Sequence, residues 1–197
     1  MKSLLLSFLI VFSFIVTSFA QLPEQATDIS PLLNGETMPN LPLTNIEGKK
    51  IPFLDVVKEK PSIVIFYRGG WCPYCNEHLA ELAQKEEKIL ELGYQIIAIS
   101  PDAIDGLSNT IDKNELKYTL LSDGNGVFSE AVGIAFKAPE RYGKRLFQVS
   151  DGENKGFLPV PAVFVVDKAG EILFEYINPN YKQRMNGDLL MAVLEQL

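Results

Sequence analysis

The chain has 197 residues, of which 47% are apolar and 22% charged, and its formal net charge is −7. This length and composition are those of a folded domain with a sizeable core, and they exclude an intrinsically disordered chain. The excess of acidic residues argues against a nucleic-acid-binding protein, which usually presents a basic face, and it offers no basic patch for anionic lipid.

Residues 1–20 are typical of a secretory signal peptide. Lys2 forms a short positive region, residues 4–16 are almost continuously apolar, and residues 18–20 form an A-x-A-like cleavage site before Gln21. An uncleaved membrane anchor is the alternative, since the apolar run approaches the shortest length that spans a bilayer. We therefore expect an exported protein, periplasmic or secreted, that meets a membrane only if this segment is not removed.

The rest of the chain, residues 21–197, is expected to form a single domain that begins with an irregular arm and a hairpin. Residues 21–41 contain three prolines and few periodic apolar positions, which is typical of an extended, irregular stretch. Residues 41–46 alternate apolar and polar side chains before Glu47-Gly48, and this pattern predicts a strand and a turn. One or two helical turns are expected over residues 52–58.

A buried strand and a helix flank the only two cysteines of the chain. The strand is predicted over residues 62–67, a continuous apolar run rich in β-branched residues, as in strands that are buried on both faces. A helix is predicted over residues 73–92, because proline suits its first position and Gly93 follows its apolar stripe. Cys72 and Cys75 therefore lie where the chain passes from strand to helix.

The remaining sequence alternates strands with helices. Further strands are predicted over residues 94–100, 118–121, 162–166 and 171–177, and further helices over residues 102–116, 127–132 and 185–197. Alternation of strands and helices predicts parallel pairing, whereas the tight turn between the last two strands predicts an antiparallel hairpin. Residues 136–158 give no clear prediction. The expected fold class is α/β, with a central mixed sheet flanked by helices and a C-terminal antiparallel hairpin.

The cysteines form the motif Trp71-Cys72-Pro73-Tyr74-Cys75, which indicates redox chemistry at sulfur. Backbone N–H groups and the dipole at a helix N-terminus favour the thiolate of Cys72, the form that attacks disulfides and peroxides. Cys75 lies about one turn deeper, and we expect it to resolve the intermediate formed on Cys72.

Two structural alternatives for the cysteines are less favoured. A disulfide that closes so small a loop stabilises a fold little through chain entropy. A zinc site needs two more ligands, and the only histidine of the chain is His78. We expect no metal and no cofactor. His78 itself is interpreted as a surface or packing residue of the helix rather than as a proton carrier.

Arg68 and Trp71 are candidates for supporting roles. A guanidinium near the sulfur would lower the pKa of the thiol and orient a peroxide oxygen, and we favour this role for Arg68 over the alternative of a solvent-facing arginine at a strand end. Trp71 offers a flat apolar wall that shields the thiolate or holds a partner peptide, and ordinary packing is the equal alternative.

The stretch Phe-Tyr-Arg-Gly-Gly-Trp-Cys-Pro-Tyr-Cys-Asn, residues 66–76, resembles the thioredoxin-fold superfamily and is most similar to the peroxiredoxin-like branch of the alkyl hydroperoxide reductase/thiol-specific antioxidant (AhpC/TSA) family. Residues 99–102, 120–123 and 158–164 support the resemblance, which extends over residues 34–196. It implies a thioredoxin-like sheet, thiol-dependent redox activity and reduction by a thioredoxin-type dithiol partner. It also implies a cis bond before Pro161, with the ring against the sulfurs and the preceding backbone open to a partner peptide.

The chain departs from both family patterns at individual positions. Typical peroxiredoxins carry Thr or Ser where this chain has Gly69, and an arginine where it has Pro161. Thioredoxins carry a buried acid where this chain has Phe66, so the proton of Cys75 needs another group or water. The site therefore resembles an intermediate between the two families, and Arg68 is the residue that could replace the missing arginine.

The sequence leaves two functions in competition. The first is a thiol peroxidase, in which Cys72 becomes a sulfenic acid, Cys75 closes a disulfide and a thioredoxin-type protein reduces it. The second is a thiol–disulfide oxidoreductase for exported proteins, whose client strand pairs with the Val160 backbone. The resemblance favours the first, whereas the cysteine spacing and Pro161 favour the second. A binding domain with an inert bridge ranks below both.

Overall fold

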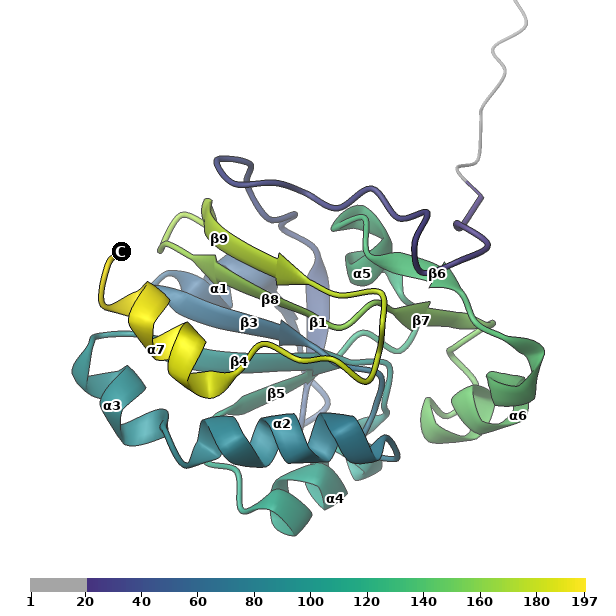
Figure 1. Cartoon of the computed structure of the whole chain (residues 1–197). Coiled ribbons are helices and arrows are strands. Elements are labelled where there is room, and N and C mark those ends of the chain that lie inside the picture. The colour runs from purple at the N-terminus through teal and green to yellow at the C-terminus, as the bar shows by residue number, and fades with distance from the viewer. Residues whose placement is uncertain (1–20) are drawn as a thin grey trace, which may run out of the picture.

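The computed structural model describes residues 21–197. The predicted signal peptide lies outside these residues and stays a prediction. Figure 1 shows a central sheet with helices on both of its faces and a smaller excursion at one end. None of the helices within residues 21–197 is long and apolar enough to cross a membrane.

The main sheet within residues 21–197 has seven strands in the order β2-β1-β5-β4-β3-β8-β9. The strands are β1 (Pro42–Asn45), β2 (Lys50–Pro52), β3 (Ser62–Phe66), β4 (Gln95–Ser100), β5 (Thr119–Ser122), β8 (Ala162–Val166) and β9 (Ile172–Ile177). β3, β4 and β5 are parallel, whereas β8 is antiparallel both to β3 and to β9. The predicted mixed sheet and the C-terminal hairpin are confirmed.

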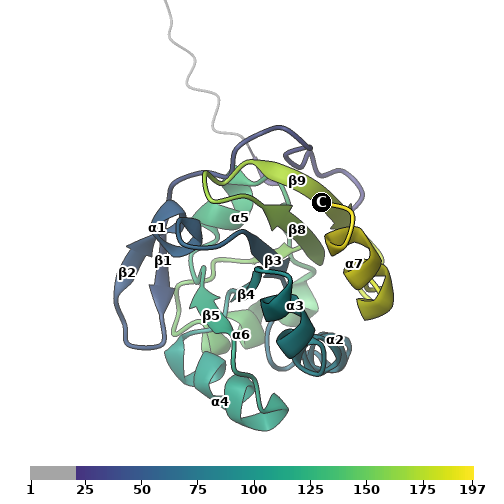
Figure 2. The ribbon, with the colours of Figure 1, turned by 90° about the vertical axis from the view of Figure 1, so that its left-hand side faces the viewer.

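Helices cover the two faces of this sheet unequally, as Figure 2 shows. One face packs against α2 (Pro73–Ala83), α3 (Glu86–Glu91), α4 (Ile104–Asn114) and α7 (Gly187–Leu194), and the other against α1 (Phe53–Val57) and α5 (Val127–Ala131). All five residues of β3 are buried, with Ile63 and Ile65 in the first core and Val64 and Phe66 in the second. This alternation is the period of two that a strand buried on both faces requires.

The helix predicted over residues 73–92 is interrupted. α2 ends at Ala83, and the N–H of Lys85 bonds to the carbonyl of Leu82, which tightens the chain before α3 begins at Glu86. Gln84 and Lys85 are ordinary helix formers, so no local signal marks this break. The last helix begins at Gly187, after a loop, rather than at residue 185.

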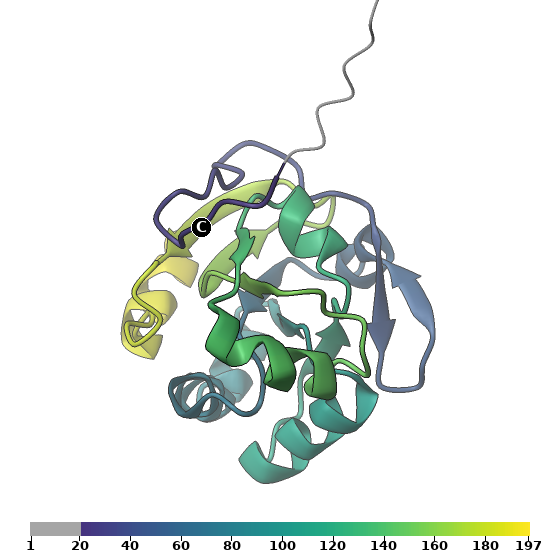
Figure 3. The same ribbon diagram turned by 90° about the vertical axis from the view of Figure 1, so that its right-hand side faces the viewer.

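The unassigned residues 136–158 form most of an excursion from the sheet. It consists of β6 (Ala135–Lys137), α6 (Glu140–Val149) and β7 (Phe157–Pro159), with β6 and β7 paired antiparallel. Figure 3 shows it in green in front of the sheet. Leu146 is the one buried residue of α6. The helix has only ten residues and contains Gly143, so its apolar positions are too few to predict a helix from the sequence.

Residues 21–41 are irregular, as predicted, and are held by backbone hydrogen bonds to three segments of the domain. The N–H of Lys137 donates to the carbonyl of Pro23, and that of Leu32 to the carbonyl of Val132. Gly35 donates to Ile172 at the start of β9. These bonds explain how a segment without regular structure takes a defined path over the surface.

Candidate active site

The two cysteines lie at the start of α2, beside the carboxyl end of β3. Cys72 is the N-cap residue, Pro73 occupies the first turn, and both cysteines are free thiols with 1% and 0% of their surface exposed. The N–H of Cys72 donates to the carbonyl of Gly69, and the Asn76 amide donates to the carbonyl of Gly70. These bonds fix the turn that carries the first sulfur.

The two thiols differ in acidity. The pKa of Cys72 is lowered to about 6, chiefly by the hydrogen bond from the Cys75 thiol, with further help from the Cys75 N–H, Arg68 and Arg184. Burial raises the pKa of Cys75, and its hydrogen bond to Cys72 raises it further. Near neutral pH the pair therefore holds a thiolate at Cys72 and a proton at Cys75.

Arg68 is buried, with 4% of its surface exposed, so the solvent-facing alternative is wrong. Its guanidinium carbon lies 4.2 Å, 4.8 Å and 4.9 Å from the ring centroids of Tyr181, Tyr142 and Trp71. Such cation–π contacts compensate part of the cost of burying a charge. Trp71 is half-buried and packs against the core cluster that contains Cys72 as well as on Tyr142, so the packing alternative is present, and its role as a wall beside the sulfur stays a prediction.

Pro161 does not have the geometry that the resemblance implied. Every peptide bond among the described residues is trans, including the bond between Val160 and Pro161. Val160 is fully buried, and its N–H donates to the carbonyl of Ile134 at 2.9 Å. The Pro161 carbonyl accepts from the N–H of Asn178. The Val160 backbone is therefore already paired within the chain rather than open to a partner peptide.

Arg184 is a site residue that the sequence reasoning missed. Its Nη2 lies 3.3 Å from the Sγ of Cys75, although 109 residues separate the two in the chain. It reaches the sulfur from the loop between β9 and α7, where a single arginine among polar residues gives no sequence signal. His78, on α2, is buried; burial and the charge of Arg184 lower its pKa to about 4, so it is neutral near pH 7.

A second missed group is Asp102, which follows β4 and is 2% exposed. Its Oδ2 accepts a hydrogen bond of 2.6 Å from the N–H of Gly70, whereas Oδ1 has no hydrogen-bond partner among the described residues. The hydroxyl of Tyr67 and the indole Nε1 of Trp71 are also buried and unpartnered there. Burial raises the pKa of Asp102 to about 6. A buried acid thus lies beside the active-site turn, although position 66 lacks one.

Replacing Asp102 by asparagine is expected to stabilise the protein at neutral pH. The carboxyl pKa rises from 3.8 to about 6 on folding, so the folded chain binds more protons than the unfolded chain in that window, and stability falls as the pH rises through it. Asp102→Asn retains an acceptor for Gly70 without the buried charge. We expect a gain on the order of 1–3 kcal/mol in the free energy of unfolding near neutral pH.

Urea denaturation at several pH values measures this effect, and the gain should vanish below the lower end of the window. Asp112→Asn is the matched control, because Asp112 is exposed on α4. A variant that is less stable than the parent at neutral pH but equally stable at low pH would show that the hydrogen bond from Gly70 to the charged carboxylate outweighs the cost of burying it.

Two cavities border the sulfur site. One of about 180 Å³ is lined by Arg68, Tyr142, Pro161 and Tyr181, among others, and one of about 400 Å³ lies between Trp71, Asp102 and α4. Within residues 21–197, no three His, Cys, Asp or Glu side chains gather in a way that could hold a metal ion. The site thus presents two thiols, two arginines and a buried carboxyl as its chemical groups.

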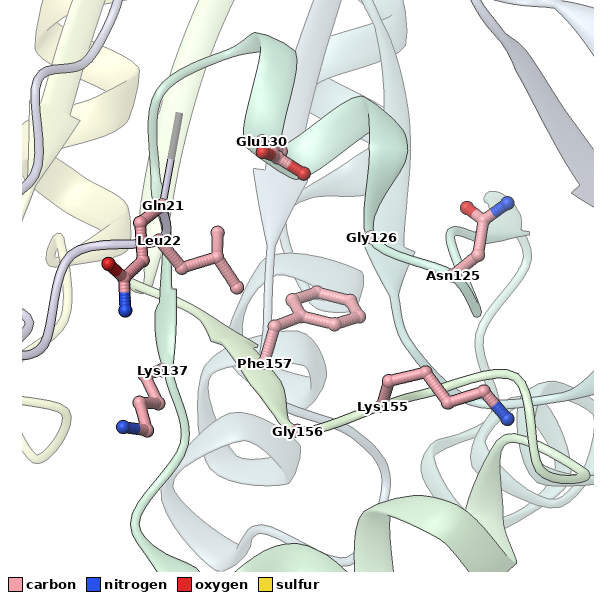
Figure 4. Close-up of a pocket in the computed structure, with 9 residues that line it drawn as sticks. All are labelled: Gln21, Leu22, Asn125, Gly126, Glu130, Lys137, Lys155, Gly156 and Phe157. Atoms are coloured by element: carbon pink, nitrogen blue, oxygen red, sulfur yellow. The ribbon is translucent and has the colours of Figure 1, made fainter. Parts of the chain in front are cut away.

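A third cavity, of about 290 Å³, is lined by none of the residues of the active-site turn, and like the other two it has neither cysteine in its lining. Figure 4 shows the side chain of Leu22 pointing toward the ring of Phe157, whereas the amino groups of Lys137 and Lys155 point away from both. The arm and the start of β7 therefore line this cavity with apolar side chains, with lysines around them.

A mixed sheet with a buried Cys-x-x-Cys pair at the junction of β3 and α2 defines a thioredoxin-fold protein of the thiol oxidoreductase class. The model of the AhpC/TSA family matches residues 34–174, and the chain belongs to this family. The predicted resemblance is confirmed.

Relatives named for each of the two functions, thiol–disulfide oxidoreductase and peroxiredoxin, are similar to the chain. Thiol-disulfide oxidoreductase ResA of Bacillus thuringiensis subsp. konkukian is 26% identical over 152 residues, which cover 77% of this chain and 73% of ResA. Peroxiredoxin Bcp of Escherichia coli K12 is 24% identical over 170 residues, covering 85% and 99%. The crystal structure of reduced Prx3 from Vibrio vulnificus in complex with H2O2 superposes with a TM-score of 0.72 at 18% identity, covering 83% and 99% of the two chains. This last likeness shows the shared fold.

Proposed function

We propose that the protein is a thiol peroxidase in which Cys72 attacks a peroxide and Cys75 closes a disulfide. The observation that carries the proposal is the unequal pair of buried thiols, with a lowered pKa at Cys72 and a raised one at Cys75. The Cys72 thiolate attacks one peroxide oxygen, the O–O bond breaks, and the departing oxygen takes a proton. Cys75 then attacks the resulting sulfenic acid, and water leaves as the disulfide forms.

The surroundings of Cys72 support a small substrate. The residue is 1% exposed, so a peroxide reaches its sulfur with less rearrangement than a protein disulfide requires. Arg68 takes the place of the arginine that peroxiredoxins carry at the position of Pro161, because its charge already acts on Cys72. A thioredoxin-type dithiol protein would return the disulfide to two thiols, as the family membership implies.

Thiol–disulfide exchange with exported proteins is the second candidate function. The similarity to ResA and the Cys-x-x-Cys spacing favour it. The backbone of Val160, which would bind the client strand, already donates its N–H to Ile134, so this function requires an opening of the chain there. Export itself remains part of the proposal and is supported by the signal-like residues 1–20.

The test is stopped-flow oxidation of the reduced protein, residues 21–197, by hydrogen peroxide, followed through Trp71, which is the only tryptophan. We expect a fast phase whose rate rises with pH through about 6 and is level at higher pH, because the Cys72 thiolate is the reacting species. A rate that keeps rising into the range of an ordinary thiol would contradict the lowered pKa.

The same instrument separates the two candidate functions. A disulfide-bonded peptide replaces the peroxide in a parallel series at equal concentration. Fast reaction with the peroxide and slow reaction with the peptide support the peroxidase. The reverse order supports disulfide exchange.

A further inference from the structure

Arg184 is held against Cys75 by its own loop. Its Nη1 donates to the carbonyl of Tyr181 and, at 2.8 Å, to that of Gln183, while Nη2 faces the sulfur at 3.3 Å. Among the residues that the structure describes, Arg184 forms no ion pair with a carboxylate. The loop carbonyls thus orient the guanidinium, and its charge remains uncompensated by any acid.

Few ionisable groups act on Cys75. Cys72 lies beside it at the start of α2, and Arg184 reaches it from the loop before α7. The phenol of Tyr67 acts on it from the end of β3, where the backbone of Arg68 also forms a hydrogen bond with it. Burial raises the pKa of the Tyr67 phenol well above its usual value, which keeps it neutral. His78, on α2, is neutral too because its pKa lies at about 4. The Cys72 thiolate and Arg184 are therefore the opposing charges at this sulfur.

Oxidation of Cys72 changes this balance in a definite direction. In the reduced protein the guanidinium of Arg184 lowers the pKa of Cys72 as well as that of Cys75, while Cys72 raises the pKa of Cys75. A sulfenic acid at Cys72 is uncharged near neutral pH, so Cys72 no longer repels a negative charge on Cys75, while Arg184 still attracts it. The guanidinium of Arg184, which stabilises the Cys72 thiolate in the reduced protein, then stabilises a thiolate at Cys75 alone.

We propose that Arg184 is a catalytic residue of the resolving step, which stabilises the Cys75 thiolate once Cys72 has become a sulfenic acid. The Cys75 thiolate attacks the Cys72 sulfur, the S–S bond forms, the S–O bond breaks, and the leaving hydroxide takes the proton that Cys75 released. Cys75 is thereby activated only after the peroxide has been reduced. The inference rests on the proposed function, since it concerns the second half of the same cycle.

The kinetic test follows both phases of oxidation in Arg184→Met and Arg184→Lys. We expect Arg184→Met to slow the second phase about tenfold or more near neutral pH and to move its pH midpoint upward, because one pKa unit changes the thiolate fraction about tenfold. The first phase should slow less, since Arg68 remains beside Cys72. Arg184→Lys should restore part of the second phase. Lys182→Met, an exposed change in the same loop, is the matched control.

A titration tests the charge argument without any turnover. Cys72→Ser removes the thiolate charge as oxidation does, and the ultraviolet absorbance of the remaining thiolate then reports the pKa of Cys75. We expect this pKa to be lower than in the parent and to rise again when Arg184→Met is added. Arg184→Gln, which is also neutral, is the variant for use if the methionine protein does not fold.

Each outcome bears on a separate claim. A parent protein without a fast first phase would overturn the proposed peroxidase. Two results would overturn the role of Arg184 and leave the peroxidase standing. One is a fast first phase in the parent together with an Arg184→Met variant that slows both phases equally. The other is a Cys75 pKa that does not change when residue 184 is replaced.

Discussion

Replacing Cys72 by serine is expected to abolish the fast reaction with hydrogen peroxide, whereas Cys75→Ser should keep that reaction and stop at the sulfenic acid. A serine hydroxyl stays protonated and is a far weaker nucleophile than a thiolate, so the rate should fall by several orders of magnitude. Cys75 should not take over, because it lies about one turn deeper in α2 and none of its surface is exposed. Stopped-flow fluorescence gives the rates, and a sulfenic-acid trap with mass spectrometry identifies the product.

The two serine variants are each other's controls, since both remove one buried sulfur from the same helix turn. A trapped sulfenic acid on Cys75 in the Cys72→Ser protein would reverse the assigned roles. Equal loss in both variants would show instead that the first attack requires the pair, because the hydrogen bond from Cys75 is the leading cause of the lowered Cys72 pKa.

The second large effect is expected at Gly69, where Gly69→Ala should cost about 3–5 kcal/mol of unfolding free energy. A Cβ there would lie 2.6 Å from the Oδ1 of Asp102 and 2.8 Å from the Cδ1 of Trp71, at a φ of +132° that side chains rarely adopt. Thermal and urea unfolding measure the loss. The Thr or Ser that typical peroxiredoxins carry at this position would meet the same atoms.

Gly93→Ala is the matched control for Gly69→Ala. Gly93 also has a positive φ, +89°, but a Cβ there meets no atom within 4 Å. It should cost only about 1 kcal/mol, from conformation alone. If the two variants lose equal stability, the turn at Gly69 relaxes and the close approach of Asp102 does not constrain it.

The sequence predicts the fold where a segment's own residues determine its environment. The apolar runs of β3, β4 and β8 identify buried strands, and their alternation with helices predicts the mixed sheet. The prediction fails for the break between α2 and α3, where helix formers continue through the turn. It also fails for the excursion over β6, α6 and β7, whose short strands and mostly polar helix are shaped by contacts with the rest of the domain.

The candidate site divides in the same way. Cys72, Cys75, Arg68 and Trp71 lie within eight positions of each other in the sequence, so their proximity follows from the strand-to-helix junction. Asp102 and Arg184 reach the site from distant segments, and only the folded chain shows that one bonds to Gly70 and the other contacts Cys75. The open Val160 backbone that the resemblance implied is not found for a related reason, since the carbonyl of Ile134, from another segment of the chain, accepts its N–H.

The distance in sequence between Cys75 and Arg184 has a consequence for biogenesis. Because a chain is synthesised from its N-terminus, both cysteines emerge while the arginine 109 residues later is still to be made. Until β8, β9 and the loop after them are in place, the cysteines lack the buried setting and the guanidinium that separate their acidities. A nascent, truncated or misassembled chain therefore carries two ordinary thiols. Only the fully folded protein gives the two thiols different pKa values.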